Sequence, residues 1–189
     1  CIRDSITIED YPLLGLVFAT IFTAIIQSSA ATLAILLSLT TILSPEGTPL
    51  VSMKTAIPVV FGANIGTCAT ALLSSIGTSR IGKQVAIAHT LIKVIGVCIF
   101  FPLTGLLIEG TNIITEFTGG GISRSIANAH TLFNTMNTII LLPFVSLITW
   151  GVCKILPEKG DTSPAELKYI GPEQITNPDV ALENARKEI

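Results

Sequence analysis

The sequence predicts an all-α membrane protein built from a re-entrant helical hairpin, a broken transmembrane helix and two further transmembrane helices. Three observations support this fold class. The chain of 189 residues is 49% hydrophobic and only 13% charged, with a mean hydropathy of +0.70, which is unusual for a soluble domain of this size. Two short polar segments, residues 27–32 and 62–70, interrupt otherwise apolar sequence. Two long apolar segments follow them.

The first polar segment, residues 27–32, reads Gln-Ser-Ser-Ala-Ala-Thr and lies between two apolar arms, residues 13–26 and 33–43. Each arm is shorter than the ~20 residues that a helix needs to cross the hydrocarbon core of a bilayer. We therefore expect the arms to form a hairpin that enters the membrane and returns to the same side, with residues 27–32 at or near its tip.

The second polar segment, residues 62–70, lies inside a longer apolar stretch, residues 55–75. Pro58, Gly62 and Gly66 remove or weaken helical hydrogen bonds in this stretch, which predicts a helix broken at membrane depth. Irregular backbone survives at that depth only where protein or a water-filled cavity covers it. Broken helices of this kind commonly build the substrate and ion sites of secondary transporters.

Two spanning helices are expected after the broken helix. The first is continuous over residues 84–107, and the second covers residues 125–155, with a kink at Pro143. A polar loop over residues 109–124, which contains three consecutive glycines, is expected between them.

A short repeat relates these two helices. Ala-His-Thr-Leu occurs at residues 88–91 and again at residues 129–132, and a proline follows each copy at the same distance. The repeat suggests that the two helices lie in comparable surroundings. The histidines, His89 and His130, could form a proton relay or bind a metal, but we favour a hydrogen bond between helices near a membrane interface.

Lys93, Asn134 and Asn137 are further polar residues within these helices. Intramembrane polar groups usually face the interior of a bundle or a cavity. Asn134 is therefore, with the two histidines, a candidate for a polar relay or a structural contact. For Lys93 we favour an ammonium group that extends to a membrane interface.

The loop charges predict the orientation of the chain. With a returning hairpin and three crossings, one side carries four basic residues: Arg80, Lys83, Lys154 and Lys159. The other side carries Glu109, Glu116 and Arg124. The positive-inside rule places the first side in the cytoplasm. The hairpin would then enter from outside, and the protein would be a multi-pass protein of the plasma (inner) membrane with a cytoplasmic tail.

The two polar segments share one kind of chemistry. They supply neutral hydroxyl and amide groups, from Gln27, Ser28, Ser29, Thr32, Asn64, Thr67 and Thr70. Half-helix N-termini would add backbone N–H groups directed at an anion. Neither segment contains Lys or Arg, and a heavily hydrated anion is costly to bury against neutral dipoles alone. We therefore expect a bound cation to supply compensating charge, and sodium suits the available oxygens. The alternative is that these small residues only allow tight helix packing.

The residues carry a family resemblance. Gln27-Ser28-Ser29, followed by Gly-Ala-Asn-Ile-Gly-Thr at residues 62–67, resembles the repeated QSSS and G-(A/S)-N-I-G-T signatures of the type II sodium–phosphate cotransporter family. The similarity is closest to bacterial members, which join a membrane domain to a cytoplasmic PhoU-like helical domain. Residues 127–134 and 177–183 also look like this family. The resemblance covers about residues 12–189 and implies the second of two inverted repeats, with the first repeat of the same polypeptide missing.

The resemblance implies sodium-dependent symport of inorganic phosphate. The alternatives are a phosphate-sensing regulatory membrane module and a sodium-coupled symporter of another oxyanion or a carboxylate. An enzyme is not expected, because the sequence has neither a nucleophile–base arrangement nor a metal motif such as HExxH. The expected partners are phosphate, sodium as the co-transported ion, the lipid bilayer and the missing repeat. A homodimer is an open alternative, and neither nucleic acid nor an organic cofactor is expected.

The resemblance also implies a division of the chain. Residues 1–10 would be a non-native or interfacial start, and residues 11–156 a transmembrane transporter repeat. Residues 157–189 would be a cytoplasmic linker and the start of a PhoU-like helical domain.

The implied binding site lies between the hairpin tip and the broken helix. Its phosphate-binding residues are Gln27, Ser28, Ser29, Asn64, Gly66 and Thr67. Its sodium-binding residues are Gln27, Thr67 and Thr70. The chain departs from the family pattern at Ala30, where a third serine is usual, and at Cys68 and Ala69, where hydroxyl residues are frequent. Ligation at the broken helix would therefore depend on the two threonines and on backbone carbonyls.

Overall fold

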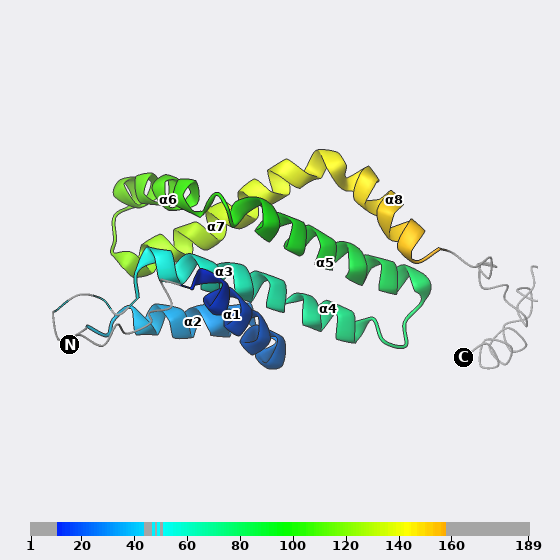
Figure 1. Cartoon of the computed structure of the whole chain (residues 1–189), viewed down its shortest axis with the longest axis horizontal. Helices are drawn as coiled ribbons and strands as arrows, with labels where there is room; N and C mark the ends of the chain where they lie inside the picture. The colour runs from blue at the N-terminus through cyan, green and yellow to red at the C-terminus, as the bar shows by residue number, and fades with distance from the viewer. Residues whose placement is uncertain (1–10, 44–46, 48, 50, 158–189) are drawn as a thin grey trace, which may run out of the picture. The chain divides into compact units, whose positions relative to one another are not determined.

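The computed structural model describes residues 11–43, 47, 49 and 51–157. The helices in these ranges are α1 (Pro12–Ile26), α2 (Ser29–Leu39), α3 (Met53–Gly66), α4 (Cys68–Ser74), α5 (Arg80–Phe100), α6 (Thr104–Thr118), α7 (Ile122–Leu141), the 3₁₀ turn η1 (Leu142–Phe144) and α8 (Val145–Ile155) (Figure 1). The chain divides into two units after Ile155. The predicted start at residues 1–10, and the predicted tail from residue 158 onward, lie outside the described residues.

Within the described residues, three helical segments are long and apolar enough to cross a membrane: Met53–Ser74, Arg80–Phe100 and Ile122–Ile155. Together with the all-helical architecture they confirm the predicted class of membrane protein. Helices α1 and α2 are apolar but contain only 15 and 11 residues, too few to span a bilayer as a straight helix. Entry of this pair into the membrane remains a prediction.

Helices α1 and α2 form a hairpin whose turn consists of Gln27 and Ser28. Gln27 ends α1 in the left-handed conformation (φ 58°), and its N–H bonds to the carbonyl oxygen of Thr23 at 2.6 Å. Ser28 caps α2, because its hydroxyl accepts the N–H of Ala31 at 3.2 Å. The buried hydroxyls of Thr23 and Thr32 lie 2.8 Å apart in a hydrogen bond that joins the two arms. Polar residues of the first segment thus build the turn itself.

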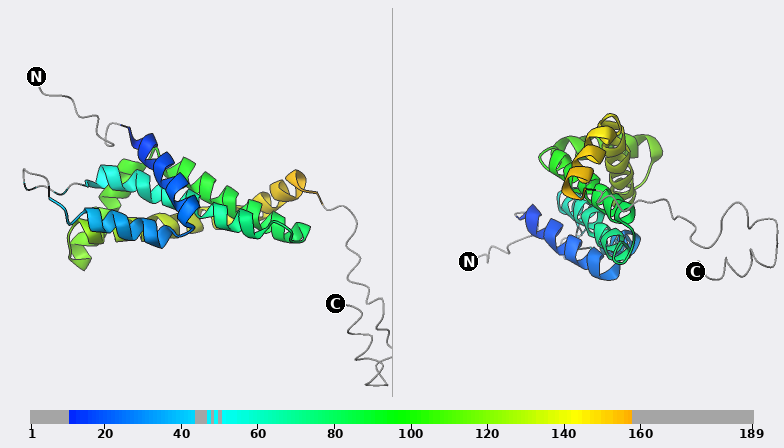
Figure 2. Two further views of the ribbon diagram at one scale, coloured as in Figure 1. Left: turned by 90° about the horizontal axis from the view of Figure 1, so that it is seen from below. Right: turned by 90° about the vertical axis from the view of Figure 1, so that its right-hand side faces the viewer.

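Two glycines of α3 allow α1 to approach it closely (Figure 2). A Cβ atom at Gly62 would overlap the carbonyl oxygen of Leu16 and lie 2.8 Å from the Cβ of Ala19. A Cβ at Gly66 would lie 2.5 Å from the Cβ of Thr23. Small residues at such positions let two helix backbones meet, which is a common packing device in membranes.

The interruption between α3 and α4 is narrower than the polar segment suggested. α3 continues through Pro58 and Gly62, and Thr67 alone separates it from α4. The dihedral angles of Thr67 remain helical (φ −63°, ψ −19°), and its N–H still bonds to the carbonyl of Ala63 at 3.3 Å. The glycines therefore serve the contact with α1 more than they break the helix.

The predicted continuous helix over residues 84–107 is wrong at its end. α5 stops at Phe100, because Pro102 lacks the N–H that would continue the helix. α6 then occupies most of the segment predicted as a polar loop, and only three glycines at 119–121 separate it from α7. α6 buries Leu107, Thr111 and Thr115 at four-residue spacing and packs on α7. The segment is thus an amphipathic helix rather than a loop.

The predicted kink at Pro143 is confirmed. The 3₁₀ turn η1 contains this proline and separates α7 from α8, which leave it in different directions (Figure 1). α5 and α7 each end two residues before a proline, Pro102 and Pro143. The repeated sequence therefore corresponds to repeated local structure at the helix ends.

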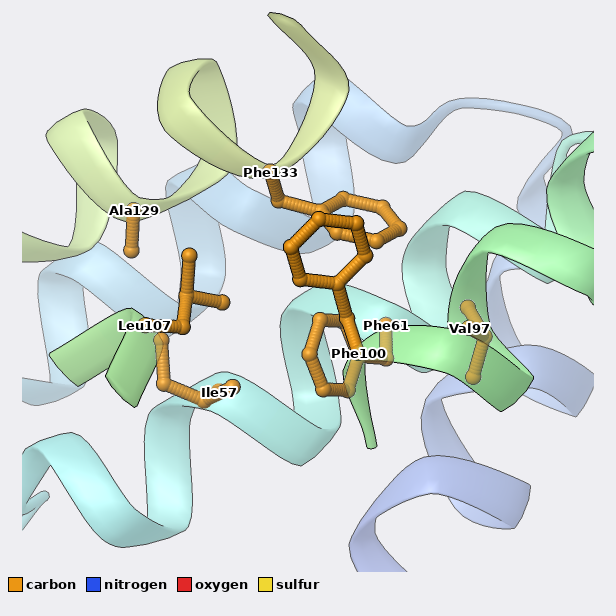
Figure 3. Packing of buried hydrophobic residues seen from close by; sticks show 7 residues of the cluster. All are labelled: Ile57, Phe61, Val97, Phe100, Leu107, Ala129 and Phe133. Carbon is orange, nitrogen blue, oxygen red and sulfur yellow. The ribbon is translucent and has the colours of Figure 1, made fainter. Parts of the chain in front are cut away.

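A core of aromatic and aliphatic side chains holds α3, α5, α6 and α7 together. Its buried members are Ile57, Phe61, Val97, Phe100, Leu107, Ala129 and Phe133 (Figure 3). The ring centroid of Phe133 lies 4.9 Å from that of Phe61 and 5.3 Å from that of Phe100. Asn64 and Lys93 lie three or four residues from core members on the same helix faces. The core thus fixes the positions from which these polar side chains extend.

Candidate functional site

A polar cavity of about 420 Å³ lies where α3, α5 and α7 meet the beginning of α2. Its lining residues are Ser29, Asn64, Thr67, His89, Lys93, His130, Thr131, Asn134 and Thr135. Every one of them has a side chain that can form hydrogen bonds. Thr131 and Thr135 are exposed, so the cavity opens at the surface of the bundle. Polar side chains gathered on apolar, membrane-length helices are costly to keep in a membrane and usually mark a functional site.

Lys93 lies at the centre of this group of side chains. Its ammonium nitrogen donates hydrogen bonds to Oδ1 of Asn64 at 2.7 Å and to Oδ1 of Asn134 at 3.0 Å. Because these residues belong to α5, α3 and α7, the ammonium group joins three helices. The prediction that Lys93 extends to a membrane interface is therefore wrong, since two amide oxygens hold it in the bundle.

The repeated Ala-His-Thr-Leu sequence also relates the two residues of the bond between Lys93 and Asn134. Lys93 and Asn134 each stand four residues after a matched histidine, so they occupy equivalent places in α5 and α7. The structure brings the equivalent places together across the cavity. The repeat relates the two helices, but it does not by itself show that their equivalent residues meet.

The charge of Lys93 has no nearby acidic partner among the described residues. Those ranges contain two carboxylates, Glu109 and Glu116, and both are exposed on α6. Neither polar segment carries a basic residue, and the structure brings one to the cavity from another helix. Helix α5 places this ammonium group beside Asn64 and Thr67.

Two buried polar atoms of the cavity residues have no hydrogen-bond partner within the described part of the chain: Nδ2 of Asn64 and Nδ1 of His89. Asn64 is only 3% exposed. Its amide cannot be turned over, because the NH₂ group would then face the ammonium group of Lys93. Buried polar groups are nearly always paired in native proteins, so an unpaired donor in a cavity indicates a place for a ligand or water.

The structure brings six of the predicted site residues to the cavity: Ser29, Asn64, Thr67, His89, His130 and Asn134. The other four do not line it: Gln27, Ser28, Gly66 and Thr70. Gln27 is exposed at the hairpin turn, Ser28 caps α2, and Gly66 is buried against α1. The ligand roles assigned to all ten residues remain predictions.

Both histidines line the cavity. Nδ1 of His89 is buried and has no hydrogen-bond partner within the described ranges. The favoured interpretation, a hydrogen bond between helices near a membrane interface, remains a prediction. The same ranges contain no group of three or more His, Cys, Asp or Glu side chains that could hold a metal ion. His89 also lines a second cavity, of about 400 Å³, between α4 and the first turns of α5. Its side chain therefore lies between the two cavities.

Comparison with known proteins places this site in a family. A family model described as Na+/Pi-cotransporter matches residues 6–118. The chain belongs to this family. The matched range contains the hairpin, the interrupted helix and Lys93, and it confirms the family that the signatures indicated. It remains a prediction that this member of the Na+/Pi-cotransporter family is the second of two inverted repeats. The PhoU-like domain also remains a prediction.

The chain is also similar to the uncharacterized protein YqeW of Bacillus subtilis (strain 168), with 36% identity over 88 residues. The alignment covers 47% of this chain and 27% of that protein. The chain thus spans about a quarter of the length of this curated relative. No solved structure matches the chain.

Proposed function

We propose that the protein containing this chain is a sodium-coupled symporter of inorganic phosphate in the plasma membrane, and that the polar cavity is part of its phosphate site. One observation carries the proposal. Ser29 from the first polar segment meets Asn64 and Thr67 from the second in a single polar cavity of an apolar bundle. Membership of the Na+/Pi-cotransporter family supports the identity of both substrates.

The cavity offers the groups that an oxyanion requires. Phosphate accepts hydrogen bonds through all of its oxygens, and the hydroxyls of Ser29 and Thr135 and the amide of Asn64 can donate them. Ser29 is also the first residue of α2, whose N-terminus favours negative charge. The arrangement thus suits a compact anion that is bound by neutral donors from several helices.

The sodium ligands remain, in our proposal, Gln27, Thr67 and Thr70. The hydroxyl of Thr67 donates its hydrogen to the carbonyl oxygen of Asn64 at 2.6 Å, so its lone pairs remain available to a cation. Thr67 is the proposed sodium ligand that also lines the phosphate cavity. We therefore propose that Thr67 links the two substrates.

Uptake of labelled phosphate by the full-length protein in proteoliposomes tests this function. We expect uptake to require a sodium gradient. Thr67→Val keeps the side-chain volume and removes an oxygen, and it should raise the sodium concentration for half-maximal uptake by roughly 10-fold, because a lost bond to a charged partner costs about 1.5–3 kcal/mol. Ser38→Ala is the control, since its hydroxyl is exposed and bonds to its own helix at 2.9 Å.

The same measurement separates the alternatives. Sodium-driven uptake that an excess of sulfate or a dicarboxylate blocks, and that unlabelled phosphate does not, would assign another anion. Phosphate binding without any uptake would favour a regulatory module. Wild-type sodium dependence in the Thr67→Val variant would remove Thr67 from the proposed sodium site.

We also propose that the α4–α5 connection faces the cytoplasm and that the end of α6 faces outward. In a protein cleared of its native cysteines, including the exposed Cys98 and Cys153, we expect Arg80→Cys to react with an impermeant thiol reagent only from the cytoplasmic side. Glu116→Cys should react only from the outside. Reaction of both positions from one side would contradict the three-crossing topology.

A further inference from the structure

The ammonium group of Lys93 is hydrogen-bonded, but no carboxylate of the described ranges pairs with its charge. Both of its partners are amide oxygens, and the two carboxylates in the described ranges lie exposed on α6. Lys93 stands well inside α5, a helix long and apolar enough to span a membrane. An uncompensated charge at such a position is costly, and intramembrane basic groups usually face a partner, a pathway or a ligand.

Lys93 and Asn64 have N–H groups that form no hydrogen bond within the described ranges. An ammonium group has three hydrogens, and the amide oxygens of Asn64 and Asn134 accept two of them. Nδ2 of Asn64 is buried without a partner in the part of the chain that the structure describes. Lys93 and Asn64 both line the cavity, so the positive charge and the amide group of Asn64 border the same space; Nδ2 itself is buried beneath the cavity lining.

We infer that Lys93 is the fixed positive charge of an oxyanion site in this cavity, with Nδ2 of Asn64 as its companion donor; the inference rests on the proposed function and names phosphate as the anion. Asn64 and Asn134 hold the ammonium group between α3 and α7. Phosphate completes the unused hydrogen bonds and balances the charge. Sodium is then not the sole compensating charge, so phosphate binds measurably without sodium and more tightly with it.

Equilibrium binding of labelled phosphate to the purified full-length protein tests the inference, with and without saturating sodium. Lys93→Met removes the charge at similar length. We expect it to weaken phosphate binding by about 100-fold, because charge-assisted bonds are roughly twice as strong as neutral ones. Lys93→Arg should retain most of the affinity. Lys83→Met, exposed in the first turn of the same helix, is the matched control and should bind phosphate as the wild type does.

A second variant separates the charge of Lys93 from its structural contacts. Asn134→Asp places a carboxylate of nearly the same shape beside the ammonium group, so the bond between α5 and α7 is retained while the charge is neutralised. We expect this variant to lose phosphate affinity to an extent comparable with Lys93→Met. Asn134 also lines the cavity, so its carboxylate would repel phosphate directly, and the melting temperature is read beside the affinity. If Lys93 were only a tie between helices, Lys93→Met would lose phosphate affinity only to the extent that it loses folded protein.

Sodium binding without phosphate, measured by the sodium-dependent shift in melting temperature, is the second readout. We expect it to stay within about threefold of wild type in Lys93→Met, since the sodium ligands are other residues. Normal phosphate affinity in Lys93→Met and Asn134→Asp would overturn the inference and leave the proposed function intact. Equal loss of sodium and phosphate binding in both variants would also overturn it. Absence of phosphate binding by the wild type would overturn the proposed function itself.

Discussion

Replacing Asn64 with leucine is expected to reduce phosphate uptake by at least about 100-fold. The two side chains are similar in size, so the packing of α3 is largely kept, but both polar contributions of Asn64 disappear. Its Oδ1 no longer accepts the 2.7 Å bond from Lys93, and its unpaired Nδ2 no longer offers a donor. Initial rates of phosphate uptake in proteoliposomes, normalised to the amount of monodisperse protein, measure the effect.

Asn128→Leu is the matched control for this substitution. Asn128 lies on α7 and donates to the hydroxyl of Thr115 at 3.0 Å, outside the lining of the cavity. Its loss should cost about 0.6–1.7 kcal/mol of stability, the range for hydrogen bonds between membrane helices. Transport per folded molecule should stay near the wild-type value. Equal losses of transport in the Asn64 and Asn128 variants would argue against the cavity as the phosphate site.

Gly62→Ala and Gly105→Ala are expected to change the free energy of unfolding in opposite directions. A methyl group at Gly62 would overlap the backbone carbonyl oxygen of Leu16, which cannot move without displacing α1. We expect a loss of about 1–3 kcal/mol or more, the usual cost of overpacking. Gly105 has no atom within 4 Å of the corresponding position, so alanine there should stabilise α6 by about 0.5–1 kcal/mol.

Reversible unfolding of the two glycine variants in detergent or bicelles provides the measurement. Because α1 also positions the hairpin turn and therefore Ser29 at the cavity, the Gly62 variant should lose phosphate uptake together with stability. Comparable stability of the two variants would show that the backbones of α1 and α3 are not held in close contact.

Local signals in the sequence predicted the elements that depend on local backbone chemistry. Pro143 interrupts its helix because it has no N–H to donate to the preceding turn. Two short apolar arms around Gln27 and Ser28 predicted a hairpin, and the left-handed residue and the serine cap that form its turn lie within that segment. Such features could be found without knowledge of which helices meet.

Features that depend on tertiary contacts were missed. The hydroxyl of Thr111 bonds to the carbonyl oxygen of Leu107 in its own helix at 2.7 Å, so a polar residue occupies the buried face of α6 and hides its amphipathic pattern. Lys93 lies at the cavity because, at this residue, α5 faces both α3 and α7. The sequence pattern of α5 alone does not say which helices it faces.

The close approach of α1 and α3 has a mechanical consequence for transport. Helices whose backbones touch at Gly62 and Gly66 cannot slide past each other, because a shift along the axis would bring larger residues to the points of contact. We therefore expect the hairpin and α3 to move together. Any shear would then fall at the boundary with α5 and α7, where the bonds from Lys93 to Asn64 and Asn134 lie. If the proposed anion binds Lys93, it lies at this boundary, so we expect its binding to bias how the site opens to either side of the membrane.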